Sequence, residues 1–360
     1  MRGIGVPMSK LWSSGIADLA PYVPGLQLHG RDVVKLNTNE SPYPPSPRAV
    51  LAMQEAASAS LNLYPDPRSA KLREAIADYH HVAVDQVYVG NGSDEVLAHA
   101  FVGLLRHDLP VLFPDITYGF YPVYCRFFGL ACEAVPLAPD MTISLEDYDR
   151  GDNPVVFPNP NAPTGVALPL PAIADWVRRR SERPVVIDEA YVDFGAESAI
   201  PLAAECENLL VVRTMSKSRG LAGMRLGYAI GAPSLIEALN RVKDSLNSYP
   251  VGRIAQVGGI ASLGDEDYFR RTVSTIVQAR EQLASRLAAD GFDLLPSSAN
   301  FIFARHPSID GAALTARLHE RGVLVRHFGG PRTSDYIRIT VGDDYQIGKL
   351  TEALAAILPR

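Results

Sequence analysis

The sequence has few cysteines and no long apolar run, and both absences exclude classes of protein. Its three cysteines, Cys125, Cys132 and Cys206, show neither Cys-x-x-Cys spacing nor clustering. This arrangement is typical of a reducing cytoplasm rather than a disulfide framework, and small buried hydrophobic positions would account for all three. No window approaches the ~18 apolar residues that would cross a bilayer, and Met1–Pro7 lacks the apolar core of a signal peptide. We therefore expect a cytoplasmic protein without a membrane partner.

The sequence also lacks an excess of positive charge and any histidine pair with the spacing of a helical zinc motif. The formal net charge of −6 argues against nucleic acid or an anionic membrane as the main partner. We expect no metal site. Hydrophobic residues make up 47% and charged residues 21% of the chain, as in an ordinary soluble globular protein. A length of 360 residues predicts roughly two domains.

Strand and helix patterns alternate through most of the chain. Residues 1–45 are expected to form an N-terminal arm that packs on a small domain. Residues 46–250 would form a large domain, whose alternating pattern predicts an α/β fold with a mainly parallel sheet flanked by helices. Its strand-like runs lie at 87–89, 111–113, 155–157, 185–187, 209–212 and 226–230. Residues 251–360 combine a long helical pattern with later strands, which predicts a smaller α+β domain.

A lysine follows one of these apolar runs. The run ends at Ser216-Lys217, and a glycine-rich turn with Arg225 comes next. Apolar walls favour the neutral, nucleophilic form of a lysine, which can form a Schiff base with an aldehyde cofactor. Ser216 and Arg225 would supply hydrogen-bond donors for a phosphate. Taken alone, the stretch is explained as well by a strand followed by a solvated basic loop.

An acid and a tyrosine, Asp188 and Tyr191, end another apolar run. Pyridoxal phosphate acts as an electron sink only while its pyridine nitrogen is protonated, so a carboxylate must face that nitrogen. Asp188 and Lys217 are the pair that this chemistry needs. A tyrosine hydroxyl near the phenolate oxygen would tune the imine.

A glycine turn, Gly92-Ser93-Asp94, precedes an expected helix. Backbone N–H groups at a helix start attract an anion, although simple capping by Ser93 and Asp94 would also explain the turn. In open α/β sheets, ligands bind at the carboxyl ends of the strands. Those ends carry Gly92, Asn161, Asp188 and Lys217.

Taken together, these motifs resemble a known family. The chain carries Asp-Glu-Ala-Tyr at 188–191, Asn-x-Pro-Thr-Gly at 161–165, and Ser-Lys followed by Gly-Leu-Ala-Gly-x-Arg-x-Gly-Tyr at 220–228. Their order is similar to that in the fold type I pyridoxal-phosphate aminotransferases, and within them the histidinol-phosphate aminotransferases. The similarity runs from Asn37 to Gly342. It implies pyridoxal 5'-phosphate as cofactor, a ping-pong amino transfer and a homodimer with shared active sites.

The resemblance implies a role for each matching residue. Lys217 would carry the internal aldimine and shuttle a proton between the substrate carbon and the cofactor. Asp188 would pair with the pyridinium, and Tyr191 would bond the phenolate oxygen. Tyr118 would stack on the ring, unless it is a core aromatic residue. Asp94 could contribute only its backbone N–H, because its carboxylate would repel a phosphate. The other implied phosphate ligands are Gly92, Ser93, Ser216 and Arg225.

Two further positions are implied at the cofactor. Tyr64 would reach the phosphate of the neighbouring subunit's cofactor. The family usually carries Asn where this chain has Ala162, and that Asn touches the phenolate oxygen. Either Asn161 takes over through a local shift, which we favour, or Tyr191 holds the oxygen with less help.

The implied substrate is histidinol phosphate, which has a phosphate ester and no α-carboxylate. Its amino group would pass to 2-oxoglutarate, giving imidazole-acetol phosphate and glutamate in histidine biosynthesis. Glutamate has two carboxylates, so one pocket must serve both kinds of anion. Arg338 would grip a carboxylate with two donors, unless it forms a strand-edge salt bridge. The other residues that the resemblance places at the substrate are Tyr22, Asn39 and Arg326.

Three alternative functions stay open from the sequence. An aromatic amino-acid aminotransferase could use the same scaffold. A pyridoxal-phosphate decarboxylase or lyase, such as a threonine-phosphate decarboxylase, would differ only in which bond at the α-carbon is broken. A non-catalytic ligand sensor with this fold would carry a DNA-binding segment, and no basic helix-turn-helix pattern is visible.

Overall fold

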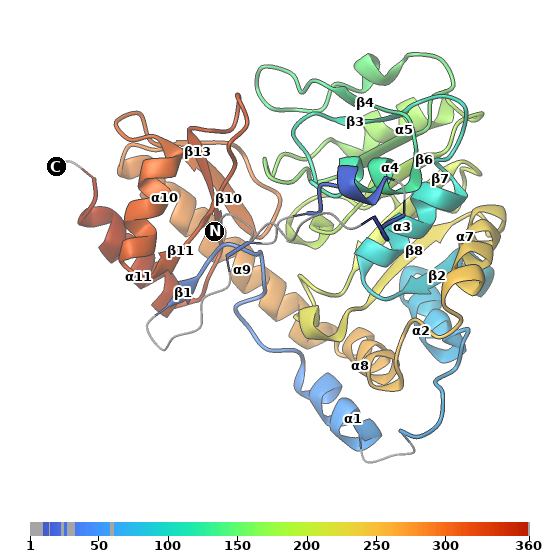
Figure 1. Ribbon diagram of the computed structural model, residues 1–360. Coiled ribbons are helices and arrows are strands. Elements are labelled where there is room, and N and C mark those ends of the chain that lie inside the picture. Colours follow the sequence, from blue (N-terminus) through green and yellow to red (C-terminus); the bar gives the residue numbers. More distant parts are fainter. Residues whose placement is uncertain (1–9, 14, 23–24, 27–32, 58–60, 359–360) are drawn as a thin grey trace.

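A seven-stranded sheet organises the larger part of the molecule. The computed structural model describes residues 10–13, 15–22, 25–26, 33–57 and 61–358 (Figure 1). The strand order is β2-β8-β7-β6-β5-β3-β4. All neighbouring strands pair in parallel except β8, which is antiparallel to both β2 and β7. The predicted α/β fold with a mainly parallel sheet is therefore confirmed. The strands are β2 (Val87–Gly90), β3 (Val111–Pro114), β4 (Cys132–Val135), β5 (Val155–Pro158), β6 (Val185–Asp188), β7 (Leu209–Thr214) and β8 (Gly227–Gly231).

Helices cover both faces of this sheet because its strands are apolar on both sides. Along β6, Val185 and Ile187 belong to one buried cluster, whereas Val186 belongs to the cluster on the opposite face. Side chains alternate along a strand, so a strand buried on both faces needs a continuous apolar run. The first face carries α2 (Ala70–His80), α5 (Leu170–Arg178), α6 (Ile200–Ala203) and α8 (Arg253–Leu263). The second carries α3 (Ser93–Gly103), α4 (Tyr121–Phe128) and α7 (Pro233–Leu246).

A smaller antiparallel sheet lies beside the first, with strand order β12-β13-β10-β9. Leu287, Leu318 and Leu354 of three helices join its buried core. The strands are β9 (Asp293–Leu294), β10 (Phe301–Arg305), β12 (Arg326–His327) and β13 (Tyr336–Thr340). The helices are α9 (Glu266–Ala289), α10 (Gly311–Glu320) and α11 (Asp344–Ala355). This part therefore has the mixed α and β composition that the sequence predicts.

The chain before the larger sheet contacts both parts. Its strand β1 (Val34–Lys35) pairs in parallel with β11 (Val323–Leu324), so an early segment lies beside a late one (Figure 1). The helix α1 (Pro47–Ala57) packs on α8, where a Cβ atom at Gly258 would lie 2.7 Å from Sδ of Met53. Short 3-10 helices complete the elements at Ile16–Asp18, Val84–Gln86, Leu145–Tyr148, Val192–Phe194 and Ala222–Met224.

The division into an arm, a large domain and a small domain stays a prediction. The packing of one helix bears on the boundary expected between the two domains. Helix α8 begins just after the boundary expected near residue 250, yet it packs with the core of the larger sheet through Ala255 and Leu263. Helix α9 links the two parts, because Arg280 donates hydrogen bonds to the carbonyl groups of Phe194 at 2.7 Å and Ala299 at 2.9 Å. The packing thus groups α8 with the larger sheet.

The edge strand β4 was not predicted from the sequence. Its residues Cys132, Glu133 and Ala134 are exposed, so it lacks the apolar run that marks the buried strands. This also corrects the interpretation of the cysteines, because only Cys125 is buried, Cys132 is exposed and Cys206 is half-buried. No helix in the described ranges is long and apolar enough to span a membrane.

Candidate active site

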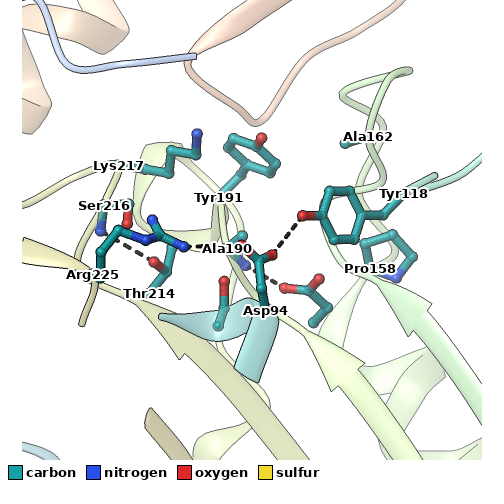
Figure 2. Close-up of a pocket in the computed structure, with 12 residues that line it drawn as sticks. Asp94, Tyr118, Pro158, Ala162, Ala190, Tyr191, Thr214, Ser216, Lys217 and Arg225 are labelled. Atoms are coloured by element: carbon teal, nitrogen blue, oxygen red, sulfur yellow. Dashed lines mark hydrogen bonds and ion pairs between the residues drawn. The ribbon is translucent and has the colours of Figure 1, made fainter. Parts of the chain in front are cut away.

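A pocket lies where three parallel strands of the larger sheet end. Pro158, Asp188 and Thr214 are the last residues of β5, β6 and β7, and all three face it. The pocket brings together residues that lie far apart in the sequence (Figure 2). Its lining residues are Ser93, Asp94, Tyr118, Pro158, Ala162, Asp188, Ala190, Tyr191, Thr214, Ser216, Lys217 and Arg225. Among the described residues, no group of three or more His, Cys, Asp or Glu side chains could hold a metal ion.

Asp188 is buried at the end of β6, and the hydrogen-bond donors to its carboxylate among the described residues are neutral. One carboxylate oxygen accepts from the hydroxyl of Tyr121 at 3.2 Å, and the other accepts from the backbone N–H of Ala190 at 3.1 Å. Burial raises the pKa of Asp188 to about 7, against the lowering effect of those two donors. A cation in the pocket would therefore stabilise the charged carboxylate.

Lys217 lies in the same pocket, after the end of β7. Its Nζ donates to the carbonyl oxygen of Thr38 at 3.1 Å and lies 5.8 Å from the centre of the Tyr191 ring. Figure 2 shows the Lys217 amine beside that ring. No carboxylate forms an ion pair with Lys217 among the described residues. The Thr38 carbonyl thus holds the amine by one hydrogen bond, which the amine can exchange for a contact with a ligand.

One corner of the pocket is formed by the turn before α3 and by Arg225. Gly92 has φ +86°, and a Cβ atom there would lie 2.7 Å from Nη2 of Arg225, so only glycine allows this approach. Across from it, a Cβ atom at Gly227 would lie 2.3 Å from the nitrogen of Ser93. Two glycines thus bring Arg225 against the start of α3, where free N–H groups attract anions.

The carboxylate of Asp94 enters this corner, which the sequence did not predict. It accepts hydrogen bonds from the Tyr118 hydroxyl at 2.6 Å and from Nη2 of Arg225 at 3.0 Å. The ring of Tyr118 therefore lines the pocket and is held by Asp94. The half-buried ring also packs against a buried cluster with other aromatic rings, so it fits in part the core role that the sequence left open.

A buried charge network supports the two segments that carry Asp188 and Lys217. Arg213 on β7 donates to Glu189 at 3.3 Å and to Asp193, and the hydroxyl of Ser218 also donates to Asp193. Glu189 and Ser218 are the sequence neighbours of Asp188 and Lys217. Sequence reasoning missed this network, although an arginine inside an apolar run was a visible signal.

A second cavity of about 280 Å³ adjoins the first and shares Tyr118, Ala162, Tyr191 and Lys217 with it. It contains the guanidinium groups of Arg326 and Arg338 besides the Lys217 amine, and no Asp or Glu is among its described lining residues. The other residues that line it are Tyr22, Gly25, Asn37, Thr38, Asn39, Thr117, Gly119, Pro163 and Phe328. All four residues predicted at the substrate, Tyr22, Asn39, Arg326 and Arg338, therefore lie together.

Arg338 is half-buried at this cavity, with its guanidinium between two aromatic rings. Its guanidinium carbon lies 5.1 Å from the centre of the Phe301 ring and 5.4 Å from that of Phe328. Nη2 donates to the carbonyl of Asn37 at 3.2 Å, while Nε has no partner among the described residues. Burial lowers the pKa of Arg338. No salt bridge of Arg338 appears in the described residues, so the strand-edge ion pair is not supported.

Three predicted residues, Gly92, Asn161 and Tyr64, are not among the lining residues of either cavity, and the last two point elsewhere. The amide of Asn161 donates to the carbonyl of Ile116 at 2.9 Å and accepts from the hydroxyl of Thr117 at 3.3 Å, so it holds a loop. Its neighbour Ala162 faces the pocket instead. Tyr64 is exposed and stacks on the ring of Tyr249 with 4.6 Å between ring centres. Within this single chain, neither side chain is placed to contact a ligand in the pocket.

Comparison with known proteins agrees with this geometry. The sequence model of the family described as aminotransferase class I and II matches residues 31–354. The chain belongs to this aminotransferase family. Its relatives include a histidinol-phosphate aminotransferase of Bradyrhizobium diazoefficiens, 57% identical over 98% of this chain and 100% of the relative. That of Gluconacetobacter diazotrophicus is 56% identical, covering 98% of this chain and 99% of the relative.

Solved structures place the aminotransferase in the same fold class. The histidinol-phosphate aminotransferase of Sinorhizobium meliloti, solved with pyridoxal-5'-phosphate, has a TM-score of 0.87 at 26% identity, covering 97% of this chain and 99% of that chain. An aspartate aminotransferase variant of Thermus thermophilus has a TM-score of 0.81 at 23% identity, with 97% and 99% covered. The predicted fold type I architecture is confirmed.

Proposed function

We propose that this aminotransferase uses pyridoxal 5'-phosphate to move the amino group of histidinol phosphate to 2-oxoglutarate. The products would be imidazole-acetol phosphate and glutamate, as in histidine biosynthesis. The observation that carries the proposal is the pair Arg326 and Arg338, beside the Lys217 amine, in a cavity whose described lining includes no Asp or Glu. Relatives at 52–57% identity that carry the name histidinol-phosphate aminotransferase support the choice of substrate over an aromatic amino acid.

The residues of the first pocket fit the cofactor. Ser93, Ser216 and Arg225 would hold its phosphate at the start of α3, and Asp188 would face its ring nitrogen. A buried carboxylate that lacks a cation matches a protonated pyridine, because each stabilises the charge of the other. When bound, pyridoxal phosphate supplies a protonated ring that withdraws electrons from the substrate's α-carbon.

The protein's own groups would handle the protons. The Lys217 side chain lines both cavities, so its amine could take a proton from the substrate carbon and deliver it to the cofactor. The Thr38 carbonyl holds the amine at 3.1 Å without neutralising a charge. The Tyr118 ring would cover one face of the cofactor, which limits the entry of water.

The second cavity would bind both substrates through one set of donors. Arg338 has an unsatisfied buried Nε, and an anion would complete its hydrogen bonds. A guanidinium offers parallel donors that suit a carboxylate or a phosphate. Arg326 and Tyr22 add donors at the same cavity. The phosphate of histidinol phosphate and the distal carboxylate of 2-oxoglutarate could therefore bind at the same place, one after the other.

Steady-state kinetics test the proposed substrate. We expect kcat/KM for histidinol phosphate, with 2-oxoglutarate as acceptor, to exceed that for phenylalanine. A more than tenfold preference for phenylalanine would instead assign the chain to the aromatic amino-acid aminotransferases. Loss of carbon dioxide instead of amino transfer would indicate a decarboxylase.

We also propose a homodimer in the cytoplasm. Stacking of Tyr64 on Tyr249 joins two segments that carry exposed apolar side chains, which supports contact with a second copy; the exposed residues are Leu61, Leu63, Tyr64, Leu246 and Tyr249. Tyr64 would then reach the phosphate of the partner's cofactor. Sedimentation velocity should give twice the mass of the 39.0 kDa chain. A monomer at micromolar concentration would contradict the proposal.

A further inference from the structure

A buried chain of hydrogen bonds ends at the hydroxyl of Tyr191. The backbone N–H of Asn39 donates to Oγ1 of Thr340 at 3.0 Å. The Thr340 hydroxyl in turn donates to Oδ1 of Asn39, also at 3.0 Å. Nδ2 of Asn39 then donates to the hydroxyl oxygen of Tyr191 at 2.9 Å. Two segments 301 residues apart in sequence thus control one side chain of the pocket.

The surroundings keep Asn39 in place. Asn39 and Thr340 are 1% and 3% exposed, so water has little access to their polar groups. The Asn300 amide donates to the backbone carbonyl of Asn39 at 3.1 Å. Asn39 has φ +55°, a left-handed conformation that asparagine tolerates better than most residues. The conformational change that matters for Asn39 is then a rotation of its side-chain amide, which would exchange Oδ1 and Nδ2.

The Thr340 hydroxyl decides which way that amide points. With its Oγ1 already accepting the backbone N–H, its single proton needs an acceptor, and Oδ1 of Asn39 supplies one. The opposite rotation would leave the Thr340 proton without a partner in a buried place, which is costly. Nδ2 is therefore directed at Tyr191, whose hydroxyl oxygen accepts. Among the described residues, the Tyr191 proton has no acceptor, so it is free to point into the cavity.

We propose that Thr340 is a positioning residue that fixes Tyr191 as a hydrogen-bond donor into the cofactor cavity, acting through the Asn39 amide. The inference rests on the proposed function, because the acceptor in the cavity would be the ring oxygen of pyridoxal phosphate. It assigns Asn39 a role at the cofactor in addition to lining the substrate cavity. The side chain of Ala162 offers no donor there, and the inference assigns that task to the Tyr191 hydroxyl.

A fixed donor at the ring oxygen has a measurable consequence. It stabilises the oxygen when negatively charged, so the cofactor bound through Lys217 loses its proton at a lower pH. If the Asn39 amide turns, the Tyr191 hydroxyl donates to Oδ1 of Asn39 instead. The visible absorbance of the loaded protein would then change at a higher pH.

The test is a pH titration of the visible absorbance of the protein loaded with pyridoxal phosphate. Thr340→Val keeps the shape and removes the hydroxyl, and we expect the midpoint to rise by about one pH unit. Thr340→Ser restores the hydroxyl and should return the midpoint to that of the wild type. Tyr191→Phe should raise the midpoint at least as much as Thr340→Val.

The double variant separates positioning from a general structural effect. If Thr340 acts through Tyr191, adding Thr340→Val to Tyr191→Phe should leave the midpoint unchanged, because the two effects share one path. An equal further rise, or a normal midpoint in Thr340→Val, would overturn the inference. Failure of the wild type to take up the cofactor and absorb visibly would instead overturn the proposed function.

Discussion

The hydroxyl of Tyr121 donates a hydrogen bond of 3.2 Å to the carboxylate of Asp188, and both side chains are buried. A phenol is a neutral donor, so it stabilises the carboxylate without cancelling its charge. Burial still dominates, since the pKa of Asp188 is raised to about 7. In the cofactor-free protein, Asp188 is thus poised between its charged and neutral forms near neutral pH.

Asp188 should make the stability of the cofactor-free protein depend on pH. Its pKa is raised from 3.8 to about 7 in the folded state, so the folded state favours the protonated form. Its contribution is therefore most favourable below pH ~4 and is lost as the pH rises to about 7. Asp188→Asn cannot ionise, so the variant should gain stability over the wild type across this window, by at most about 4 kcal/mol. Melting temperatures measured from pH 4 to 8 would test this, and parallel curves would contradict it.

Tyr121→Phe should extend the upper end of that pH window to higher pH. The variant removes a donor to the charged form, and the pKa of Asp188 should rise further. Tyr124→Phe is the matched control, because its hydroxyl donates to the backbone carbonyl of Asp94 at 2.9 Å and not to Asp188. The same melting series should shift only in the first variant. Equal shifts in both would mean that the Tyr121 hydroxyl has no specific effect on Asp188.

Arg213→Met should strongly destabilise the fold. The change leaves Glu189 and Asp193 buried without their cation, which costs about 3–5 kcal/mol. The exposed pair of Arg178 with Glu205 supplies a control, and Arg178→Met should cost less than about 1 kcal/mol. Urea unfolding measures both values. A small loss for Arg213→Met would show that the network does not hold the two pocket segments.

Arg338→Lys should weaken the use of 2-oxoglutarate. Lysine keeps a positive charge but lacks the parallel donors of guanidinium, so we expect kcat/KM to fall about 10- to 100-fold. Arg305→Lys is the control on β10, next to β13, because Arg305 is exposed and pairs with Asp293. Steady-state kinetics with varied 2-oxoglutarate would measure the change. An unaltered kcat/KM would move the carboxylate site away from Arg338.

The sequence predicts the parts of the molecule that depend on local pattern. Buried strands are apolar runs, and parallel strands bring their carboxyl ends to one edge, so Asp188 and Lys217 could be placed together. The edge strand β4 could not be predicted, because exposed residues do not form an apolar run. Asn161 was assigned to the cofactor by its place in a motif, but its direction depends on the Ile116 carbonyl, a contact across 45 residues.

The contacts of Thr340 and Arg213 also could not be predicted from the sequence. Each depends on partners distant in the chain, and neither residue type marks a function by itself. Tyr121 likewise looked like one aromatic residue among several in a helix. Local pattern thus reveals which groups meet at the pocket, whereas their supports emerge only from packing.

Amino transfer from histidinol phosphate is tested most directly by a single half-reaction. Protein loaded with pyridoxal phosphate is titrated with histidinol phosphate, without 2-oxoglutarate, while its visible absorbance is recorded. We predict that the visible band is converted to the pyridoxamine form, that phenylalanine does the same only at far higher concentration, and that Lys217→Ala shows no conversion. An unchanged wild-type spectrum with histidinol phosphate, or undiminished conversion in Lys217→Ala, would contradict the account.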